Sequence, residues 1–250
     1  MTKILLCGCC GRMGKFVAET VNNRNDCEIV AGIDIIDDSS LGFPVFANYD
    51  EVSVDADVII DFSNPALLSS MLAYAERTNT AIILATTGLD DEQIKAVENT
   101  ANIIPVFFSY NYSLGISLLC ELSKVAAKVL GNGFDIEIVE AHHNQKLDAP
   151  SGTAIMLGNA VKEELPDAYF EYDRHSKRQK RNGNEIGIHS IRGGTIVGEH
   201  QVMFAGNDEI ITLSHSARSR AVFATGAVNA AVFIKDKNPG MYNMSDIVRS

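Results

Sequence analysis

Short apolar runs alternate with segments of helical periodicity from the N-terminus to about residue 108. Continuous apolar runs such as Ile82-Ile83-Leu84 indicate strands buried on both faces, as in a parallel sheet covered by helices. Repeated βαβ units with right-handed crossovers predict an α/β, doubly wound, Rossmann-like fold. The expected strands are Lys3–Cys7, Glu28–Asp34, Asp57–Phe62, Ala81–Ala85 and Ile103–Phe108, and the expected helices are Arg12–Asn22, Ala66–Arg77 and Asp90–Thr100.

The pattern changes after about residue 113, where a smaller α+β domain with an antiparallel or mixed sheet is expected. Three strand-like segments lie close together near its end, separated by short breaks that contain glycine or asparagine. The elements expected here are a long apolar helix at Leu114–Leu130, a strand at Phe134–Ala141, a helix beginning near Ser151, and strands at Ile186–Arg192, Thr195–Phe204 and Glu209–Ser216.

An alanine-rich helix is expected from about Ser219 to Ile234. Packing of this helix against the first domain would make that domain discontinuous. The predicted domains are therefore 1–112 with 221–250, and 113–220.

The formal net charge of -11 argues against a nucleic-acid partner, because affinity for phosphate backbones comes mainly from Lys and Arg. The N-terminal segment lacks the long apolar region of a secretory signal, and no stretch approaches the roughly 20 apolar residues of a membrane span. We therefore expect a cytoplasmic protein with no membrane contact.

Five cysteines, an odd number clustered near the start of the chain, fit no disulfide framework. The sequence Cys7-Gly8-Cys9-Cys10 lacks a second ligand pair at zinc-finger spacing, so no metal is predicted. Small side chains filling a crowded turn are the simpler interpretation.

A glycine-rich turn, Gly8-Cys9-Cys10-Gly11-Arg12-Met13-Gly14, follows the first expected strand and opens a helix. Bare backbone at such a turn can approach a pyrophosphate at the helix N-terminus. The second strand ends at Asp34, where a carboxylate would accept hydrogen bonds from the adenosine ribose. The spacing of the glycines alone is weak evidence, and Asp34 could simply cap a turn, but together they favour dinucleotide binding.

Asp34 is followed by Ile35, Ile36, Asp37 and Asp38, with no Arg or Lys placed to meet a 2′-phosphate. The neighbouring carboxylates would repel that phosphate. We predict that NADH is preferred and that NADPH use is possible.

Two polar segments follow later strands of the first domain, at the ends where parallel strands present ligand loops. Each would be an ordinary turn if taken alone. They are Ala85-Thr86-Thr87-Gly88 and Ser109-Tyr110-Asn111-Tyr112.

The most informative stretch runs from Glu140 to Thr153, where a strand leads through a loop into a helix. Two histidines and a lysine, His142, His143 and Lys146, can exchange protons or supply a fixed positive charge. The helix N-terminus at Gly152-Thr153 would bind a carboxylate.

Each of these residues also has a structural interpretation. The histidines could be polar residues at a strand end, Lys146 a solvated cation, and Ser151 only an N-cap. Their density on one loop beside a cofactor domain favours function. A zinc site at His142-His143 is disfavoured because adjacent strand residues point to opposite faces.

On these motifs the whole chain resembles the 4-hydroxy-tetrahydrodipicolinate reductases, formerly called dihydrodipicolinate reductases, of the diaminopimelate and lysine pathway. The carriers are the glycine turn, Ala85-Thr86-Thr87-Gly88, Glu140-Ala141-His142-His143 with Lys146, Asp148-Ala149-Pro150-Ser151-Gly152-Thr153, Arg192-Gly193-Gly194, Val197-Gly198-Glu199-His200, and Ser219-Arg220.

The resemblance implies a dinucleotide-binding first domain, a substrate-binding and oligomerisation second domain, and a homotetramer. It implies catalytic roles for His142, as proton donor or acceptor, and Lys146, as a second proton donor. It further implies that the substrate-binding residues are His143, Ser151, Gly152, Thr153 and Arg220, and that the cofactor-binding residues are Gly8, Cys9, Cys10, Gly11, Arg12, Met13, Asp34, Ala85, Thr86, Thr87, Ser109, Tyr110, Asn111 and Tyr112.

The implied reaction is reduction of a cyclic imine dicarboxylate, with hydride passing from nicotinamide C4 to ring C4. A proton donor must neutralise the charge that builds on the ring nitrogen, and His142 and Lys146 are both available acids. The chain departs from the family at Cys9 and Cys10, where small residues are usual, and at Ile35, where members that use NADPH often carry a basic residue.

Residues 171–184 form a dense polar run that is expected to be a solvated loop, with a mobile lid over an anionic substrate as the alternative. Two rival functions share the first domain. Another two-domain nicotinamide dehydrogenase, of an amino acid or polyol, would lack the His142–Thr153 segment. A silent dinucleotide sensor would have lost His142 or Lys146, and both are present.

Overall fold

The computed structural model describes residues 1–36 and 38–250, and the chain forms two compact units. Unit 1 comprises Met1–Ser113 and Arg220–Ser250, and unit 2 comprises Leu114–Ser219. Asp37, one of the acids counted against NADPH, lies outside the described residues.

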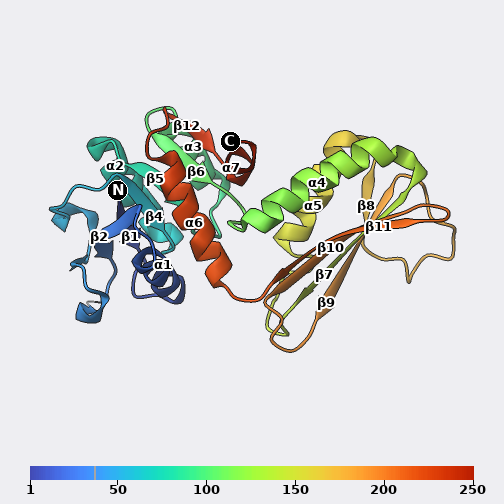
Figure 1. The fold of residues 1–250 in the computed structure, drawn as a ribbon, viewed down its shortest axis with the longest axis horizontal. Helices are drawn as coiled ribbons and strands as arrows, with labels where there is room; N and C mark the ends of the chain where they lie inside the picture. The colour runs from blue at the N-terminus through green and yellow to red at the C-terminus, as the bar shows by residue number, and fades with distance from the viewer. Residues whose placement is uncertain (37) are drawn as a thin grey trace. The chain divides into compact units, whose positions relative to one another are not determined.

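Unit 1 is built on a sheet of seven parallel strands in the order β12-β6-β5-β4-β1-β2-β3 (Figure 1). The predicted parallel, doubly wound sheet is confirmed. Two edge strands were not predicted, because two or three residues are too few to show a period. The strands are β1 (Thr2–Cys7), β2 (Cys27–Ile33), β3 (Val45–Phe46), β4 (Val58–Asp61), β5 (Ala81–Leu84), β6 (Pro105–Phe108) and β12 (Gly240–Tyr242).

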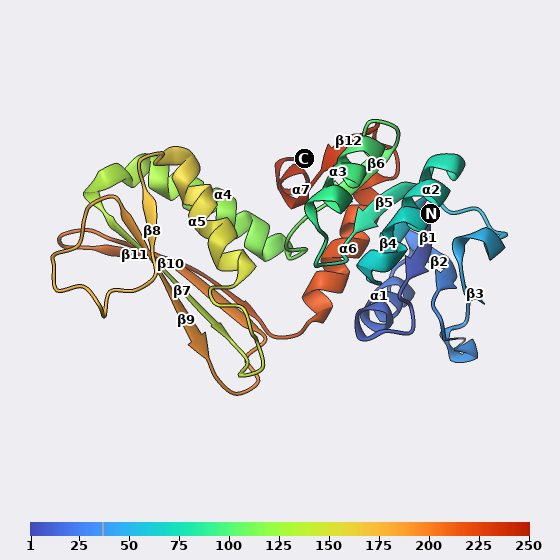
Figure 2. The same cartoon turned by 180° about the vertical axis from the view of Figure 1, so that it is seen from behind.

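Helices cover both faces of this sheet, because alternate residues of each strand are apolar on opposite sides. Ile4 and Leu6 of β1 pack with α1 (Arg12–Asn22) and α6 (Ala221–Ile234). Leu5 packs with α2 (Leu68–Thr78) and α3 (Asp91–Thr100) on the other face (Figure 2). The remaining helical segments of the unit are the 3₁₀ turns Ser39–Leu41, Tyr49–Glu51 and Pro65–Leu67 and the short helix α7 (Met244–Arg249).

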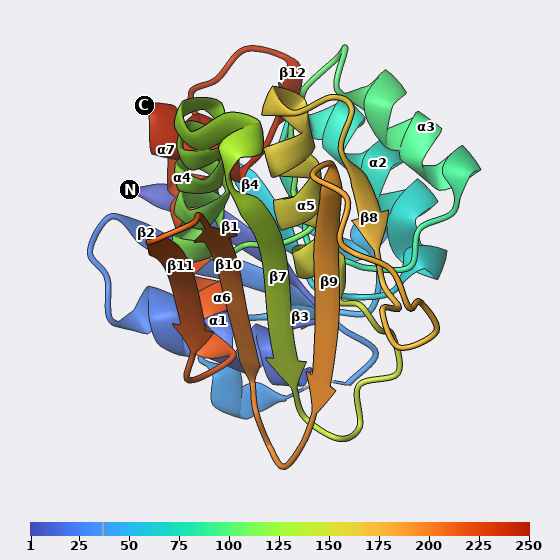
Figure 3. The same cartoon turned by 90° about the vertical axis from the view of Figure 1, so that its right-hand side faces the viewer.

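Unit 2 holds a mixed sheet in the order β11-β10-β7-β9-β8, with helices α4 and α5 packed together beside it (Figure 3). Although β9 and β10 are consecutive in the chain, β7 lies between them, pairing parallel with β9 and antiparallel with β10. The elements are α4 (Leu114–Leu130), the 3₁₀ turn Gly131–Gly133, β7 (Asp135–His142), α5 (Gly152–Glu164), β8 (Tyr169–Glu171), β9 (Glu185–Arg192), β10 (Gly198–Ala205) and β11 (Ile210–Ala217).

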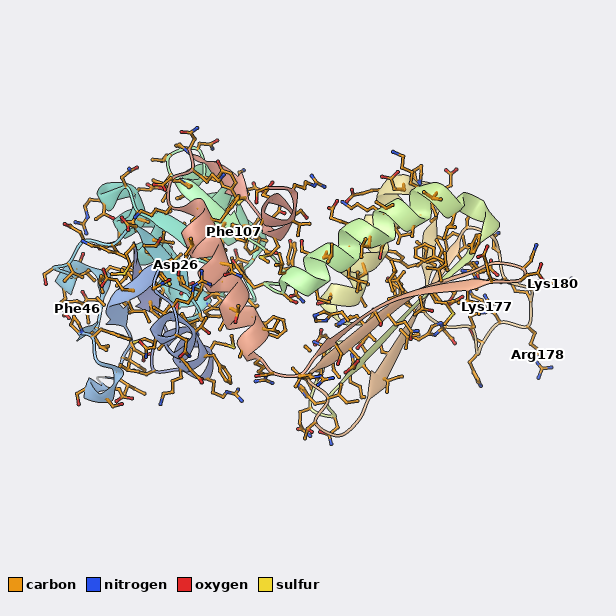
Figure 4. The ribbon with its side chains drawn as sticks, in the orientation of Figure 1. Asp26, Phe46, Phe107, Lys177, Arg178 and Lys180 are labelled. Carbon is orange, nitrogen blue, oxygen red and sulfur yellow. The ribbon has the colours of Figure 1, made fainter. Side chains whose placement is uncertain are left out.

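The polar run between β8 and β9 is a loop tied to the sheet by ion pairs. Arg181 reaches Asp135 at 2.8 Å and Glu137 at 3.0 Å, and Lys177 pairs with Glu171. Figure 4 shows Lys177, Arg178 and Lys180 along this loop. Lys177 and Arg181 therefore hold the loop to its own unit.

None of the helices in the described part of the chain is both long and apolar enough to cross a membrane.

The helix α6 approaches the chain at Tyr112 so closely that only glycine fits at Gly226. A Cβ at this position would lie 1.6 Å from the Tyr112 carbonyl oxygen. Exposed helix positions gain about 1 kcal/mol when Gly becomes Ala. Overpacking against rigid backbone costs about 2 kcal/mol or more, so the clash at Gly226 outweighs the gain in helix propensity and the substitution should destabilise the protein.

We therefore predict that Gly226→Ala lowers the thermal midpoint of the protein, measured by circular dichroism. Gly183→Ala is the matched control, because a Cβ there meets no atom within 4 Å. A Gly226→Ala midpoint equal to that of the control would contradict the tight packing of α6.

Candidate active site

A fully buried carboxylate, Glu140 on β7, organises the chemical end of unit 2. The guanidinium of Arg192, at the end of β9, grips it with two hydrogen bonds of 2.7 and 2.8 Å. Its oxygens also accept hydrogen bonds from the His142 ring at 2.6 Å and the Ser151 N–H at 3.1 Å. Burial opposes ionisation, but hydrogen bonds from Arg192, Ser190 and His142 outweigh it and hold the pKa of Glu140 at about 2.

His142 stands two residues further along β7, on the same face as Glu140. Because its Nδ1 faces the Glu140 carboxylate, that atom carries the proton and Nε2 is the nitrogen left for chemistry. Burial lowers the pKa of His142 below its usual 6.5, with Glu140 opposing this effect and Lys146 and Arg192 adding to it. At neutral pH the ring is therefore mainly neutral.

Nε2 of His142 lies over the backbone of Gly198 at the start of β10. A Cβ added at Gly198 would come within 3.3 Å of it. The glycine therefore leaves room at the reactive nitrogen.

Lys146 lies on the loop after β7, and its ammonium is 2.8 Å from the Asp148 carboxylate. The loop is held by backbone hydrogen bonds to the turn after β9: Gly193 N–H donates to His142 and Asn144 N–H donates to Gly194. Asp148 is exposed, and its pKa is lowered chiefly by the hydrogen bond from Lys146. An anion that displaced the exposed Asp148 carboxylate would pair with the half-buried Lys146 ammonium.

The N-terminus of α5 opens beside this loop. Ser151 is its N-cap, because its Oγ accepts a hydrogen bond from Ala154 N–H. Gly152 and Thr153 form the first turn, and a Cβ at Gly152 would meet no atom within 4 Å. The positive end of a 13-residue helix thus faces open space at Gly152, as an anion site requires.

His200 of β10 packs behind these groups and is only 5% exposed. Its Nε2 is 3.0 Å from Ser151 Oγ, and its ring meets the His142 ring edge to face at 5.1 Å. Burial, followed by the nearby His142, lowers the pKa of His200 to about 4. The residue is therefore neutral near pH 7.

Sequence reasoning missed the roles of Glu140, Arg192 and His200 in this network. All three stand in motifs that the chain shares with the family it resembles, and this could have indicated that they have a functional role. Nothing in the sequence shows that residues 52 positions apart pair with each other, because that follows from the register of β7 against β9.

The glycine turn of unit 1 lies between β1 and α1. Gly8 has a φ of +74°, and a Cβ on it would lie 2.6 Å from the Phe62 carbonyl oxygen. A Cβ on Gly14 would lie 2.2 Å from the Gly8 carbonyl oxygen. These two glycines are therefore required by the turn itself, while Gly11 is the N-cap of α1.

Asp34 follows β2 and lies beside this turn. One carboxylate oxygen accepts a hydrogen bond from Cys10 N–H at 2.9 Å, and the other from Ile36 N–H at 3.3 Å. The structure also brings a cation here that the sequence did not suggest, because Lys15 of α1 lies 3.9 Å from the Asp38 carboxylate. The pKa of Asp38 is lowered, first by Ser40 and weakly by Lys15.

The other predicted cofactor residues lie after β5 and β6. Ala85 N–H donates to the main-chain carbonyl of Asp61. The Asp61 side chain is buried, and burial raises its pKa although hydrogen bonds from Ser63 oppose this. Tyr110 is 79% exposed. Tyr112 is different, because its ring is in the core and its hydroxyl donates to main-chain carbonyls, at 2.7 Å to Leu84. Its side chain is therefore a packing element.

The predicted residues thus form two groups. All of the predicted cofactor residues belong to unit 1 and both predicted catalytic residues to unit 2. The predicted substrate residues are in unit 2 except Arg220, which is exposed at the N-cap of α6 in unit 1.

Both halves of the chain match models of one protein family. Residues 2–112 match "Dihydrodipicolinate reductase, N-terminus" and residues 115–248 match "Dihydrodipicolinate reductase, C-terminus". A relative from Clostridium novyi, named 4-hydroxy-tetrahydrodipicolinate reductase, is 49% identical over 100% of this chain and 99% of its own. One of the same name from Caldanaerobacter subterraneus is also 49% identical, with the same coverage.

Among solved structures, a dipicolinate-bound dihydrodipicolinate reductase from Paenisporosarcina sp. TG-14 has a TM-score of 0.81. It is 27% identical and covers 99% of both chains. A myo-inositol dehydrogenase from Sinorhizobium meliloti, described as putative in its own name, has a TM-score of 0.62 at 13% identity, over 93% of this chain and 88% of its own. That likeness shows the fold alone.

The depressed pKa of His200 predicts a loss of stability in mild acid. An unfolded chain binds a proton at this histidine near pH 6.5, whereas the folded chain does so only near pH 4. The unfolded state therefore holds more protons in this window, and the free energy of unfolding falls as the pH drops from 6.5 toward 4. Between pH 6.5 and about pH 5, protonation of His200 in the unfolded chain lowers the free energy of unfolding by about 2 kcal/mol.

Urea unfolding near pH 7 and pH 5 measures this decrease, with His200→Gln as the variant because Gln keeps a donor for Ser151. We expect the variant to lose about 2 kcal/mol less than the wild type between the two conditions. Equal losses would show that His200 does not carry the effect.

Proposed function

The chain belongs to the dihydrodipicolinate reductase family of nicotinamide-dependent oxidoreductases, and we propose that it reduces 4-hydroxy-tetrahydrodipicolinate, via dihydrodipicolinate, to tetrahydrodipicolinate in diaminopimelate and lysine biosynthesis. The observation that carries the proposal is the arrangement of His142 on the buried Glu140, beside Lys146 and the open N-terminus of α5. A proton donor next to an anion site is what reduction of a cyclic dicarboxylate requires.

The substrate carries two carboxylates, and unit 2 offers matching groups. Lys146 would exchange its exposed partner Asp148 for one carboxylate. The first turn of α5, at Gly152 and Thr153, would accept a carboxylate with backbone N–H groups, and His143 would add a further donor. Arg192 is excluded from this role because Glu140 already occupies its guanidinium.

The solved relative from Paenisporosarcina was determined with dipicolinate, an aromatic dicarboxylate. Its fold covers 99% of this chain. A dicarboxylate ligand in a relative of this similarity supports a dicarboxylate substrate here.

Bound nicotinamide cofactor would supply the hydride. The residues of unit 1 fit such a ligand, because the Gly8 turn leaves backbone exposed at the start of α1 and Asp34 stands beside it with its carboxylate half-buried. Asp34 would accept hydrogen bonds from the adenosine ribose. The polar backbone at Ala85–Thr87 and Ser109–Asn111 would meet the nicotinamide amide.

Protonation of the ring nitrogen falls to His142 or Lys146, and the structure favours Lys146 at neutral pH. His142 has a lowered pKa, so few molecules carry the imidazolium that an acid needs. With Nδ1 fixed on Glu140, the neutral ring presents Nε2 as an acceptor. We infer that Lys146 donates the proton to the ring nitrogen and supplies positive charge where the negative charge develops, while neutral His142 orients the substrate through Nε2.

The assignment of NADH as preferred cofactor remains a proposal. It rests on Asp34 and Asp38 at the predicted ribose site and on the exposed, apolar Ile35 between them. Lys15 could attract a 2′-phosphate, but Asp38 partly neutralises it. The balance of charge therefore favours NADH and leaves NADPH usable.

Assembly into a homotetramer and a cytoplasmic location stay predictions. In support of assembly, β11 is an eight-residue edge strand with Ile210 63% exposed. Long apolar edges of this kind are usually covered.

The direct test is oxidation of NADH by the purified protein with freshly synthesised 4-hydroxy-tetrahydrodipicolinate, followed by nicotinamide absorbance. We expect rapid turnover in the wild type. His142→Gln and Lys146→Ala should each lower kcat about a hundredfold or more, because each removes a group that exchanges or stabilises charge in the transition state.

Lys128→Ala is the matched control, because it removes a lysine from an exposed position of α4 away from the site. NADH affinity, measured by fluorescence, should be nearly unchanged in all three variants. Binding of NADH without any turnover in the wild type would indicate another substrate or a sensor.

Cofactor choice is tested by kcat/KM for NADH and NADPH. We expect NADH to be favoured by roughly tenfold, equivalent to about 1.4 kcal/mol of repulsion at the 2′-phosphate. Asp38→Asn should raise kcat/KM for NADPH more than for NADH, since it leaves Lys15 uncompensated. A clear advantage of NADPH in the wild type would overturn the proposal.

A further inference from the structure

Two thiols and a carboxylate converge at the glycine turn of unit 1. The Sγ atoms of Cys9 and Cys10 and a carboxylate oxygen of Asp34 all lie within 4.8 Å of one another. Within residues 1–36 and 38–250, this is the one group of at least three His, Cys, Asp or Glu side chains found with such spacing. Asp34 comes from the end of β2, 24 residues after Cys10, so the sequence pattern around the cysteines does not reveal it.

The backbone holds these groups in place. Cys9 is fully buried beneath the turn, where its side chain packs so closely on β2 that a Cβ at Gly32 would lie 2.5 Å from its Sγ. Cys10 is half-buried, and its N–H donates to the Asp34 carboxylate. Cys10 and Asp34, both half-buried, give access to the cluster from solvent.

The distances suit a soft metal ion. Zinc–sulfur bonds of about 2.3 Å in a tetrahedron place two sulfur ligands about 3.8 Å apart. The two Sγ atoms are 3.9 Å apart, although the cysteines are adjacent in the chain. Thiolate ligands select soft ions over Mg²⁺ or Ca²⁺.

We propose that Cys9, Cys10 and Asp34 bind a thiophilic divalent cation such as Zn²⁺, through both Sγ atoms and one carboxylate oxygen, with a fourth position left to water. Binding releases the two thiol protons to solvent.

The site has a regulatory consequence that rests on the proposed function. Asp34 is the residue proposed to accept hydrogen bonds from the adenosine ribose, and it cannot serve the ion and the ribose with the same oxygens. The turn that holds Cys9 and Cys10 is also the proposed pyrophosphate site. Ion and nicotinamide cofactor therefore exclude each other, and the ion inhibits competitively with NADH.

Ion binding is measured on the full chain, reduced and freed of metal, by Zn²⁺ titration in competition with a chromophoric chelator. Cd²⁺ serves as a second probe, because thiolate–cadmium bonds give an ultraviolet charge-transfer band. We expect one Zn²⁺ per chain, at least a tenfold weaker affinity in Cys10→Ala, and a smaller loss in Asp34→Asn.

Cys120→Ser, which removes a buried thiol of unit 2, is the matched control and should keep full affinity. Circular dichroism checks that each variant is folded, and Cys10→Ser replaces Cys10→Ala if the latter is not. Absence of stoichiometric binding, or equal affinity in the wild type and the Cys10 variant, would overturn the site.

Competition is measured by NADH fluorescence titration with and without saturating Zn²⁺. At a Zn²⁺ concentration just sufficient to saturate the wild type, we expect the apparent affinity for NADH to weaken at least tenfold in the wild type and much less in the Cys10 variant. An unchanged NADH affinity in the wild type would refute the mutual exclusion. Failure of the metal-free protein to bind NADH would count against the proposed function instead, and the chelator titration would still decide whether the ion site exists.

Discussion

The chemistry of unit 2 depends on the buried Glu140 carboxylate. A charge removed from water is costly unless it is paired and hydrogen-bonded, and Glu140 meets this condition through Arg192, His142 and Ser151. Each donor comes from a different part of the chain: the end of β9, the end of β7 and the N-cap of α5. The carboxylate thereby links the ends of the two strands to the start of the helix. The hydrogen bond from His142 Nδ1 to Glu140 also sets the tautomer of His142. The bond that helps to stabilise the buried carboxylate therefore also leaves Nε2 as the unprotonated nitrogen.

In unit 1 the limiting constraint is steric. The turn between β1 and α1 closes so tightly that side chains at Gly8 and Gly14 would collide with backbone atoms. This closeness brings the N-terminus of α1 against the end of β2, where Cys10 N–H meets Asp34. Backbone N–H groups, a carboxylate and two thiols therefore crowd into one small volume. The turn proposed to bind the ribose and pyrophosphate of a dinucleotide therefore also holds, in Cys9, Cys10 and Asp34, the ligand set proposed for a soft metal ion.

The positively charged side chains of unit 2 are of two kinds: those paired with acids of the unit, and Lys146, which can exchange its partner for a ligand. Both terminal nitrogens of Arg192 are bonded to Glu140, and the cations of the 171–184 loop include Arg181 and Lys177, which pair with acids of their own unit. Lys146 differs, because its partner Asp148 is exposed and replaceable. The burial of His142 and His200 keeps both rings neutral near pH 7. The proposed dicarboxylate substrate would therefore meet the Lys146 ammonium and the N-terminus of α5.

The sequence alone determined the parallel sheet, its main helices and the segment that carries the candidate chemistry. Apolar runs such as Ile82–Leu84 show burial on both faces, and periodicity sets the bounds of α1 and α4, because these signals are local. The two-residue strand β3 and the placement of β7 between β9 and β10 depended on pairing with distant residues. The roles of Glu140, Arg192 and Lys15, the core position of Tyr112, and the meeting of Cys9 and Cys10 with Asp34 were decided by tertiary structure. Hydrogen bonds, ion pairs and burial act through space, and the chain brings those partners together only when the sheet register and the close packing of the turn are set.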